Sequence, residues 1–260
     1  MNKPTLKIVK IGGNVINNID VLHSFLKDFA ALDGPKILVH GGGRKASEVS
    51  AAMGLEPKMI KGRRVTDEAT IEVVTMVYAG LLNKNITAKL QSFGCNSMGL
   101  SGADANCILA HKRIVKDIDY GFAGDVDAIN SEIIDVLLQN NVTPVFCAIT
   151  HDKNGQLLNT NADTIASEVA IGMSNLYKVE LNYVFELKGV LENIEDENSV
   201  ITDINLEKYR QLVAKGIIAD GMLPKLHNCF NSLEKGVNKV KIGDALLMKK
   251  TNKLYTTLSL

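Results

Sequence analysis

The chain has 260 residues, 46% hydrophobic and 22% charged, and its 29 basic and 29 acidic residues give a formal net charge of zero. This length suits one large domain or two closely packed lobes, and the balanced charge argues against nucleic-acid binding, which usually needs a basic excess. The cysteines lack metal-ligand or redox spacing, and no apolar run approaches the ~20 residues that span a bilayer. We therefore expect a soluble cytoplasmic protein with free thiols and no membrane partner.

Strand-like and helix-like segments alternate along the chain. Short apolar runs predict strands at residues 6–11, 36–40, 96–100, 142–149, 176–186, 237–242 and 253–256. Helical spacing of apolar residues predicts helices at 19–29, 44–53, 67–90, 162–173, 206–215 and 223–235, and one more capped by Asn130. Residues 107–128 alternate and carry glycines, which predicts hairpins. The near-continuous apolar strands indicate an α/β fold, a three-layer sandwich with a mostly parallel central sheet and two tightly packed lobes.

Two of the predicted strands end in glycines next to a basic residue. In Lys10-Ile11-Gly12-Gly13, a cation stands beside bare backbone amides at the carboxyl end of a strand, where open α/β sheets bind ligands. In His40-Gly41-Gly42-Gly43-Arg44, three glycines precede a helix whose N-terminus favours negative charge. Residues 41–46 also fit a dinucleotide pattern, but the required acidic residue ~20 positions on is missing from a basic stretch, so an NAD oxidoreductase is disfavoured. Anion recognition is common to both explanations.

Three further polar motifs carry possible chemistry, and each also has a plain structural explanation. Gly62-Arg63-Arg64-Val65-Thr66 offers arginines for a carboxylate, or two solvated side chains. Asn159-Thr160-Asn161-Ala162-Asp163 crowds polar groups where a helix starts, although Asn161 is also a good N-cap. Asp220-Gly221-Met222-Leu223-Pro224-Lys225 puts a lysine in the first turn of a helix, where it opposes the dipole unless an anion binds. We expect His40 to hydrogen-bond at its glycine turn rather than act as a base.

Taken in order and spacing, the five motifs resemble the amino-acid kinase family, and within it the N-acetylglutamate kinases. The resemblance covers essentially the whole chain. It implies ATP-dependent phosphorylation of the side-chain carboxylate of an N-acylated glutamate, a step of arginine synthesis. In that family pattern Lys10 and Lys225 bind the transferring phosphoryl group from two sides, and Asp163 orients both lysines.

The resemblance also implies binding residues and cofactors. Those for the acyl-glutamate are Gly42, Gly43, Arg64, Asn159 and Asn161. Those for the nucleotide are Gly12, Gly13, Glu186 and Gly189. ATP would enter with Mg²⁺ on its phosphates rather than in a protein metal site. The chain departs from the family where Phe185-Glu186-Leu187 replaces the usual Ser/Thr-Asp-Val.

The family pattern further implies an acyl-glutamate-binding lobe at residues 1–173 and a nucleotide-binding lobe at 174–260. Arginine-inhibited hexameric members carry an extra N-terminal helix, whereas nine residues precede Lys10 here, so we expect a homodimer without arginine feedback. The acyl group is acetyl or succinyl, and Arg63 is a candidate to meet a succinyl carboxylate. The alternatives are a kinase for another small carboxylate or carbamate, and a non-catalytic amino-acid or nucleotide sensor. Retention of both lysines and Asp163 speaks against the sensor.

Overall fold

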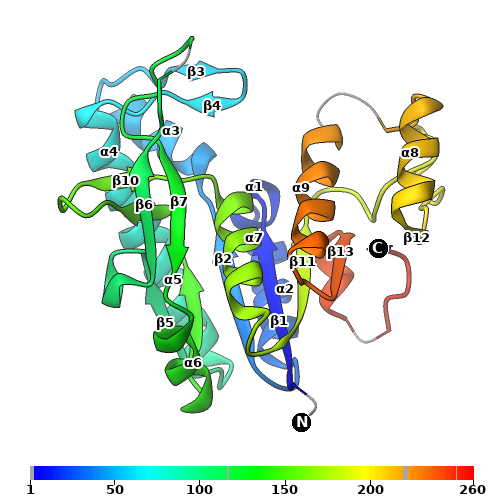
Figure 1. Cartoon of the computed structure of the whole chain (residues 1–260). Coiled ribbons are helices and arrows are strands. Elements are labelled where there is room, and N and C mark those ends of the chain that lie inside the picture. Colours follow the sequence, from blue (N-terminus) through cyan, green and yellow to red (C-terminus); the bar gives the residue numbers. More distant parts are fainter. Residues whose placement is uncertain (1–2, 116, 219–221, 250) are drawn as a thin grey trace.

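A single central sheet organises the molecule. The computed structural model describes residues 3–115, 117–218, 222–249 and 251–260. The sheet has eight strands in the order β12-β14-β13-β11-β1-β2-β8-β5 (Figure 1). Their bounds are β1 Thr5–Ile11, β2 Lys36–His40, β5 Ser97–Leu100, β8 Thr143–Phe146, β11 Lys178–Val184, β12 Asp203–Ile204, β13 Lys239–Gly243 and β14 Thr256–Leu258. All neighbours run parallel except the pair β13–β14, so the predicted mostly parallel sheet is confirmed.

Helices cover both faces of this sheet. The helices are α1 Gly13–Asn17, α2 Ile19–Ala30, α3 Gly43–Ala52, α4 Glu68–Thr75, η1 Met76–Leu82, α5 Asn83–Ser92, α6 Ser131–Gln139, α7 Ala162–Met173, α8 Leu206–Ala214 and α9 Met222–Glu234. Two short 3₁₀ turns are η2 Asp104–Asn106 and η3 Ala245–Met248. Figure 1 shows α7 and α9 together on one face, and α2 packs on the other.

Side chains alternate between the two faces along each strand, as the pleat of a strand requires. In β1, Ile8 joins the apolar cluster on the α7 side, whereas Val9 and Ile11 join the cluster around α2. Lys10 therefore points to the α7 side, where the helix begins with polar residues. The alternation gives the three layers predicted from the sequence, and it also directs the Lys10 side chain toward the start of α7.

Two smaller sheets lie beside the central one. The strands β6 Ile108–Lys112, β7 Gly124–Ile129, β9 Ile149–His151 and β10 Leu157–Asn159 form a four-stranded sheet in the order β10-β9-β6-β7. The strands β3 Met59–Ile60 and β4 Arg63–Arg64 form a hairpin. Each residue of the hairpin is exposed except Arg64, which is buried.

The expected strand at residues 142–149 is wrong as a single element. The chain leaves the central sheet after β8 and enters the four-stranded sheet as β9, with Cys147 and Ala148 between them. Both strands are buried, so the apolar run is continuous and hydrophobicity alone does not show the change of sheet. The expected strand at 253–256 is displaced as well, because β14 begins only at Thr256.

The predicted helix at 67–90 is helical throughout, but its middle turn is a π-helix. Asp67 caps α4 by accepting a hydrogen bond from Thr70 N at 2.9 Å. The π segment η1 carries Tyr78 and Leu82 toward the glycine turn after β2. π-helical turns are rare and frequently mark functional sites. Within the described ranges, no helix has both the length and the apolar character needed to cross a membrane.

Candidate active site

A cavity of about 440 Å³ opens at the carboxyl ends of β1 and β2. These strands are parallel neighbours, and Ile11 and Gly41 at their ends line the cavity. The helices α1, α3 and α7 begin at its wall with Gly13, Gly43 and Ala162. Helix N-termini carry partial positive charge, so the cavity favours anionic ligands.

The structure gathers most of the site residues predicted from the sequence in this cavity. Its lining includes Lys10, Gly12, Gly13, Gly42, Gly43, Arg64, Asn159, Asn161 and Asp163. The lining also includes residues that belong to none of the five sequence motifs, among them Ser47, Tyr78 and Arg113. These three come from α3, η1 and the end of β6, and no local pattern marks them.

Lys10 and Asp163 form an ion pair inside the cavity. Lys10 Nζ lies 2.8 Å from Asp163 Oδ1, and only 8% of Lys10 is exposed. Asp163 stands in the first turn of α7, whose N-cap Asn161 accepts hydrogen bonds from Asp163 N (2.8 Å) and Thr164 N (3.2 Å). Tyr183 donates a hydrogen bond to the Asp163 carbonyl at 3.2 Å. The first turn of α7 thus places the Asp163 carboxylate within ion-pair distance of the Lys10 ammonium, although Oδ1 accepts no well-aligned hydrogen bond from a described residue.

Arg64 is a buried cation without a carboxylate partner in the described part of the chain. Its Nη2 donates to the Gly43 carbonyl at 2.8 Å and to Ser47 Oγ at 2.7 Å. Its Nη1 is buried and has no hydrogen-bond partner among the described residues. Buried polar groups are normally satisfied, so this nitrogen suits an anionic ligand. Burial raises the pKa of Tyr78, and the neighbouring Arg64 guanidinium opposes that shift.

The glycine turn after β2 tolerates no side chain at its second position. Gly42 has φ +155°, and a Cβ there would lie 2.3 Å from Leu82 Cδ1 and 3.0 Å from Tyr78 Cδ1. The π-helix η1 is therefore packed directly on the turn that starts α3. The amide of Gly12 donates to the Val184 carbonyl at 3.1 Å, whereas Gly13 begins α1, where the N–H has no intrahelical acceptor.

His40 is fully buried and hydrogen-bonds to the glycine turn that follows β2. Its Nδ1 donates to the Gly41 carbonyl at 2.8 Å, and its Nε2 accepts from Asn83 Nδ2 at 3.0 Å. Burial lowers the pKa of His40 to about 4. The imidazole is neutral and both nitrogens are occupied, in agreement with the predicted packing role.

Asn159, at the end of β10, also lines the cavity. Its Nδ2 donates to Thr66 Oγ1 at 3.0 Å, and Thr66 is completely buried. This contact ties the end of β10 to the segment after Arg64. Arg64 and Asn159, both predicted to bind the acyl-glutamate, are therefore parts of one connected wall of the cavity.

Three predicted residues do not line the cavity. Lys225 lies in the first turn of α9, and its Nζ is 4.3 Å from the centre of the Phe185 ring. Glu186 lines a neighbouring cavity of about 650 Å³ together with Phe185 and Arg44. A Cβ on Gly189 would lie 2.6 Å from Thr256 Oγ1, so this glycine permits close packing. Asp220 and Gly221 of the same sequence motif as Lys225 lie outside the described residues.

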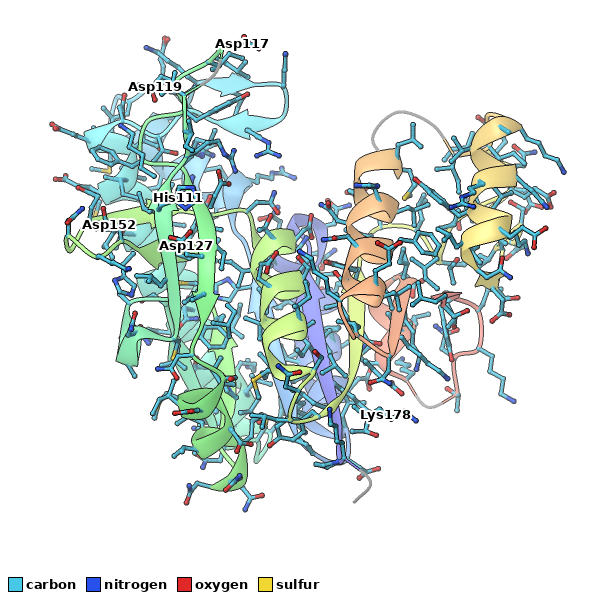
Figure 2. The ribbon with its side chains drawn as sticks, in the orientation of Figure 1. His111, Asp117, Asp119, Asp127, Asp152 and Lys178 are labelled. Carbon is cyan, nitrogen blue, oxygen red and sulfur yellow. The ribbon has the colours of Figure 1, made fainter. Side chains whose placement is uncertain are left out.

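The lining is strongly cationic. Its charged side chains are Lys10, Arg44, Arg63, Arg64, Arg113 and the carboxylate Asp163. Arg113 is bound by Asp125, whose pKa it lowers through hydrogen bonds. Another ion pair, His111 with Asp127, lies on the neighbouring strands β6 and β7 (Figure 2), and neither residue lines the cavity. In the described part of the chain, no group of three or more His, Cys, Asp or Glu is placed to hold a metal ion.

Comparisons with known proteins agree with this geometry. The model of the amino acid kinase family matches residues 5–244. The chain belongs to the amino acid kinase family. An acetylglutamate kinase from Cytophaga hutchinsonii is 54% identical over 92% of this chain and 91% of its own length. An acetylglutamate kinase from Phocaeicola vulgatus is 50% identical over 92% of this chain and 93% of its own length.

A solved structure is similar as well. The structure of smu.665 from Streptococcus mutans matches with a TM-score of 0.76 and 27% identity, and the match covers 98% of each chain. The family resemblance found in the motifs is thus confirmed over most of the chain.

Proposed function

We propose that this chain is an enzyme that transfers the γ-phosphoryl group of ATP to the side-chain carboxylate of N-acetyl-L-glutamate. The observation that carries the proposal is one cavity lined both by the Lys10–Asp163 pair and by Arg64, whose buried Nη1 has no hydrogen-bond partner among the described residues. The names of the relatives, at 54% and 50% identity, support the substrate. The product is an acyl phosphate, and the reaction belongs to arginine biosynthesis.

In this proposal Arg64 binds the substrate α-carboxylate. A guanidinium matches a carboxylate with two parallel hydrogen bonds, and Nη1 is available for one of them. Asn159 and Asn161 flank the same wall, and Gly42 and Gly43 let the substrate approach the start of α3. The side-chain carboxylate then extends toward Lys10.

The chemistry needs charge neutralisation rather than a base. A glutamate side-chain carboxyl has a pKa near ~4.3 and is ionised at neutral pH. Its oxygen attacks the γ-phosphorus, a new O–P bond forms, and the bond to the bridging oxygen breaks, so that its electron pair leaves with ADP. Lys10 and Lys225 offset the charge on the transferring group, and Asp163 orients Lys10. His40 is neutral and occupied, which suits a mechanism without a general base.

ATP would bring Mg²⁺ on its phosphates, where the ion offsets their negative charge. We assign the acyl-glutamate to residues 1–173 and the nucleotide to residues 174–260, with Gly12 and Gly13 at the phosphates and Glu186 and Gly189 nearer the nucleoside. The amide of Gly13 is the better phosphate donor of the two glycines, because that of Gly12 is bound to Val184. We further propose a cytoplasmic homodimer. The open edge strand β5, with Met98 44% exposed, supports such pairing, and light scattering tests it.

The test is hydroxylamine trapping of the acyl phosphate with N-acetylglutamate, N-succinylglutamate and free glutamate side by side. We expect ATP-dependent turnover of the N-acetyl substrate and none of free glutamate. Lys10→Ala and Lys225→Ala should lower kcat far more than they raise KM for the acyl-glutamate. Absence of turnover with every N-acyl substrate, in protein that binds ATP, would overturn the proposal.

A further inference from the structure

One aromatic ring contacts both of the predicted catalytic lysines. Phe185 follows the last residue of β11, and its amide donates to the Gly243 carbonyl at 2.8 Å. This backbone bond anchors the residue at the ends of two adjacent strands, β11 and β13. The backbone of Phe185 is therefore held at the carboxyl edge of the sheet.

Both lysine ammonium groups lie over this ring. Lys10 Nζ is 5.3 Å from the ring centre, and Lys225 Nζ is 4.3 Å from it. Each distance is within the ~6 Å at which an aromatic face attracts a cation. The two lysines come from β1 and α9, far apart in sequence, and the ring is their shared contact.

Among the described residues, few contacts other than the Phe185 ring hold Lys225. None of the ion pairs between described residues involves it. It stands in the first turn of α9, where the helix dipole repels a cation. The charge of Lys10 repels it too. The attraction of the Phe185 ring opposes both repulsions.

The ring is itself braced. Tyr183 stacks against Phe185 with ring centres 5.8 Å apart and an angle of 6° between the planes. Tyr183 is buried and donates its hydroxyl hydrogen bond to the Asp163 carbonyl at 3.2 Å. Asp163 in turn pairs with Lys10. The ring, the aspartate and the lysines thus form one connected support.

We propose that Phe185 is a positioning residue, whose ring holds the ammonium groups of Lys10 and Lys225 together in readiness for the phosphates of ATP. This rests on the proposed function. A carboxylate in the same place would hold the lysines more strongly, but it would compete with phosphate for them. An aromatic face attracts cations through its quadrupole and carries no net charge, so the lysines stay available.

The test compares Phe185→Leu, which keeps apolar volume without the ring, with Phe185→Tyr, which keeps the ring. For Leu we expect a roughly 5- to 30-fold loss in kcat/KM for ATP. We expect KM for the acyl-glutamate to change less than twofold, and the Tyr variant to recover most of the loss. Equal losses toward both substrates would indicate a general structural role and overturn the proposal.

A graded series separates the ring's charge distribution from its shape. Incorporation of mono-, di- and trifluorophenylalanine at position 185 weakens the negative face stepwise at nearly constant size. We expect the affinity for the ATP analogue AMP-PNP, measured by calorimetry, to fall stepwise with fluorine number. An unchanged affinity across the series would refute the proposal. Since this binding needs no acceptor, it remains informative even if N-acetylglutamate is not the substrate, which the trapping assay decides separately.

Phe93→Leu is the matched control. Phe93 also has a lysine over its ring, Lys89 at 6.0 Å, and contacts the His23 ring at 5.1 Å. It lies at the end of α5 and does not line the cavity. The same substitution there should leave kcat/KM for ATP within twofold of the parent.

Discussion

Arg64→Met separates substrate binding from folding. Arg64 is 8% exposed, and the substitution removes its guanidinium while it keeps a long apolar side chain in its place. Two hydrogen bonds from Nη2 are lost, and a desolvated cation without a carboxylate partner in the described structure disappears as well. Gly43 is exposed and Ser47 is half-buried, so water can reach their oxygens. The loss of the hydrogen bonds lowers stability, whereas removal of the desolvated cation raises it. We therefore expect the free energy of unfolding to change by less than about 1.5 kcal/mol.

Binding of the acyl-glutamate should suffer far more. Truncating one partner of a buried, hydrogen-bonded charge pair costs about 2–5 kcal/mol. This corresponds to a rise in KM of roughly 30- to 4,000-fold, at 1.4 kcal/mol per factor of ten. The trapping assay over a range of acyl-glutamate concentrations measures it, with Arg210→Met as control because Arg210 is exposed on α8 and does not line the cavity.

A thermal-shift measurement gives the same answer without turnover. Ligand at 100 times Kd stabilises the parent by about 2.7 kcal/mol, or about 5–10 °C for a chain of this size. The shift with acyl-glutamate should vanish for Arg64→Met and persist for Arg210→Met. A KM within threefold of the parent, together with an unchanged shift, would refute the assignment of Arg64 to the carboxylate.

Three further predictions concern the same site. Asp163→Asn removes the partner of the buried Lys10, so the rate constant of phosphoryl transfer in single-turnover assays should fall at least about 100-fold, and a fall of less than threefold would contradict the pairing. His40 has its pKa lowered to about 4, so the unfolded chain binds a proton at higher pH than the folded one. Stability should therefore decrease as pH falls from about 6.5 to about 4, by roughly 3 kcal/mol, and urea titrations should show a smaller decrease for His40→Gln. Gly42→Ala should lower the free energy of unfolding by about 2–4 kcal/mol and abolish activity, because its Cβ would meet Leu82 Cδ1 at 2.3 Å. Adding Leu82→Ala should recover part of that stability, and no recovery would place the strain in the backbone alone.

Much of the fold was predictable because local signals agree with the final structure. The expected bounds of β2 and α7 match the observed strand and helix. Asn130 and Asn161 cap α6 and α7 as their positions before apolar periodic runs predicted. Apolar strands between amphipathic helices indicated a parallel sheet, but they carry no information on the order of its strands. The π-helix was also invisible, because one extra residue in a turn leaves the apolar pattern of residues 67–90 nearly unchanged.

Site residues that belong to a sequence motif were predictable, whereas residues that reach the cavity through the packing of helices were not. The glycines that follow Lys10, and those on either side of Gly42, marked the carboxyl edge of the sheet, and the cavity lies there. Ser47 and Tyr78 reach the cavity only because α3 and η1 pack together. In the sequence, Phe185 is distinguished only as a departure from the family pattern. Its contact with two lysines could not be predicted, because it depends on β1, the end of β11 and α9 meeting in space.

The place of β1 in the middle of the sheet affects how the chain is made. Residues 5–11 pair with β2 soon after synthesis, whereas their other neighbour, β11, lies at residues 178–184. At roughly 5–20 residues per second, a ribosome takes about 10–35 s to supply it. During that interval the nascent chain carries an open, apolar strand edge, which is a hazard for aggregation. A fragment that ends before residue 178 never closes this edge, so it should need a chaperone to stay in solution.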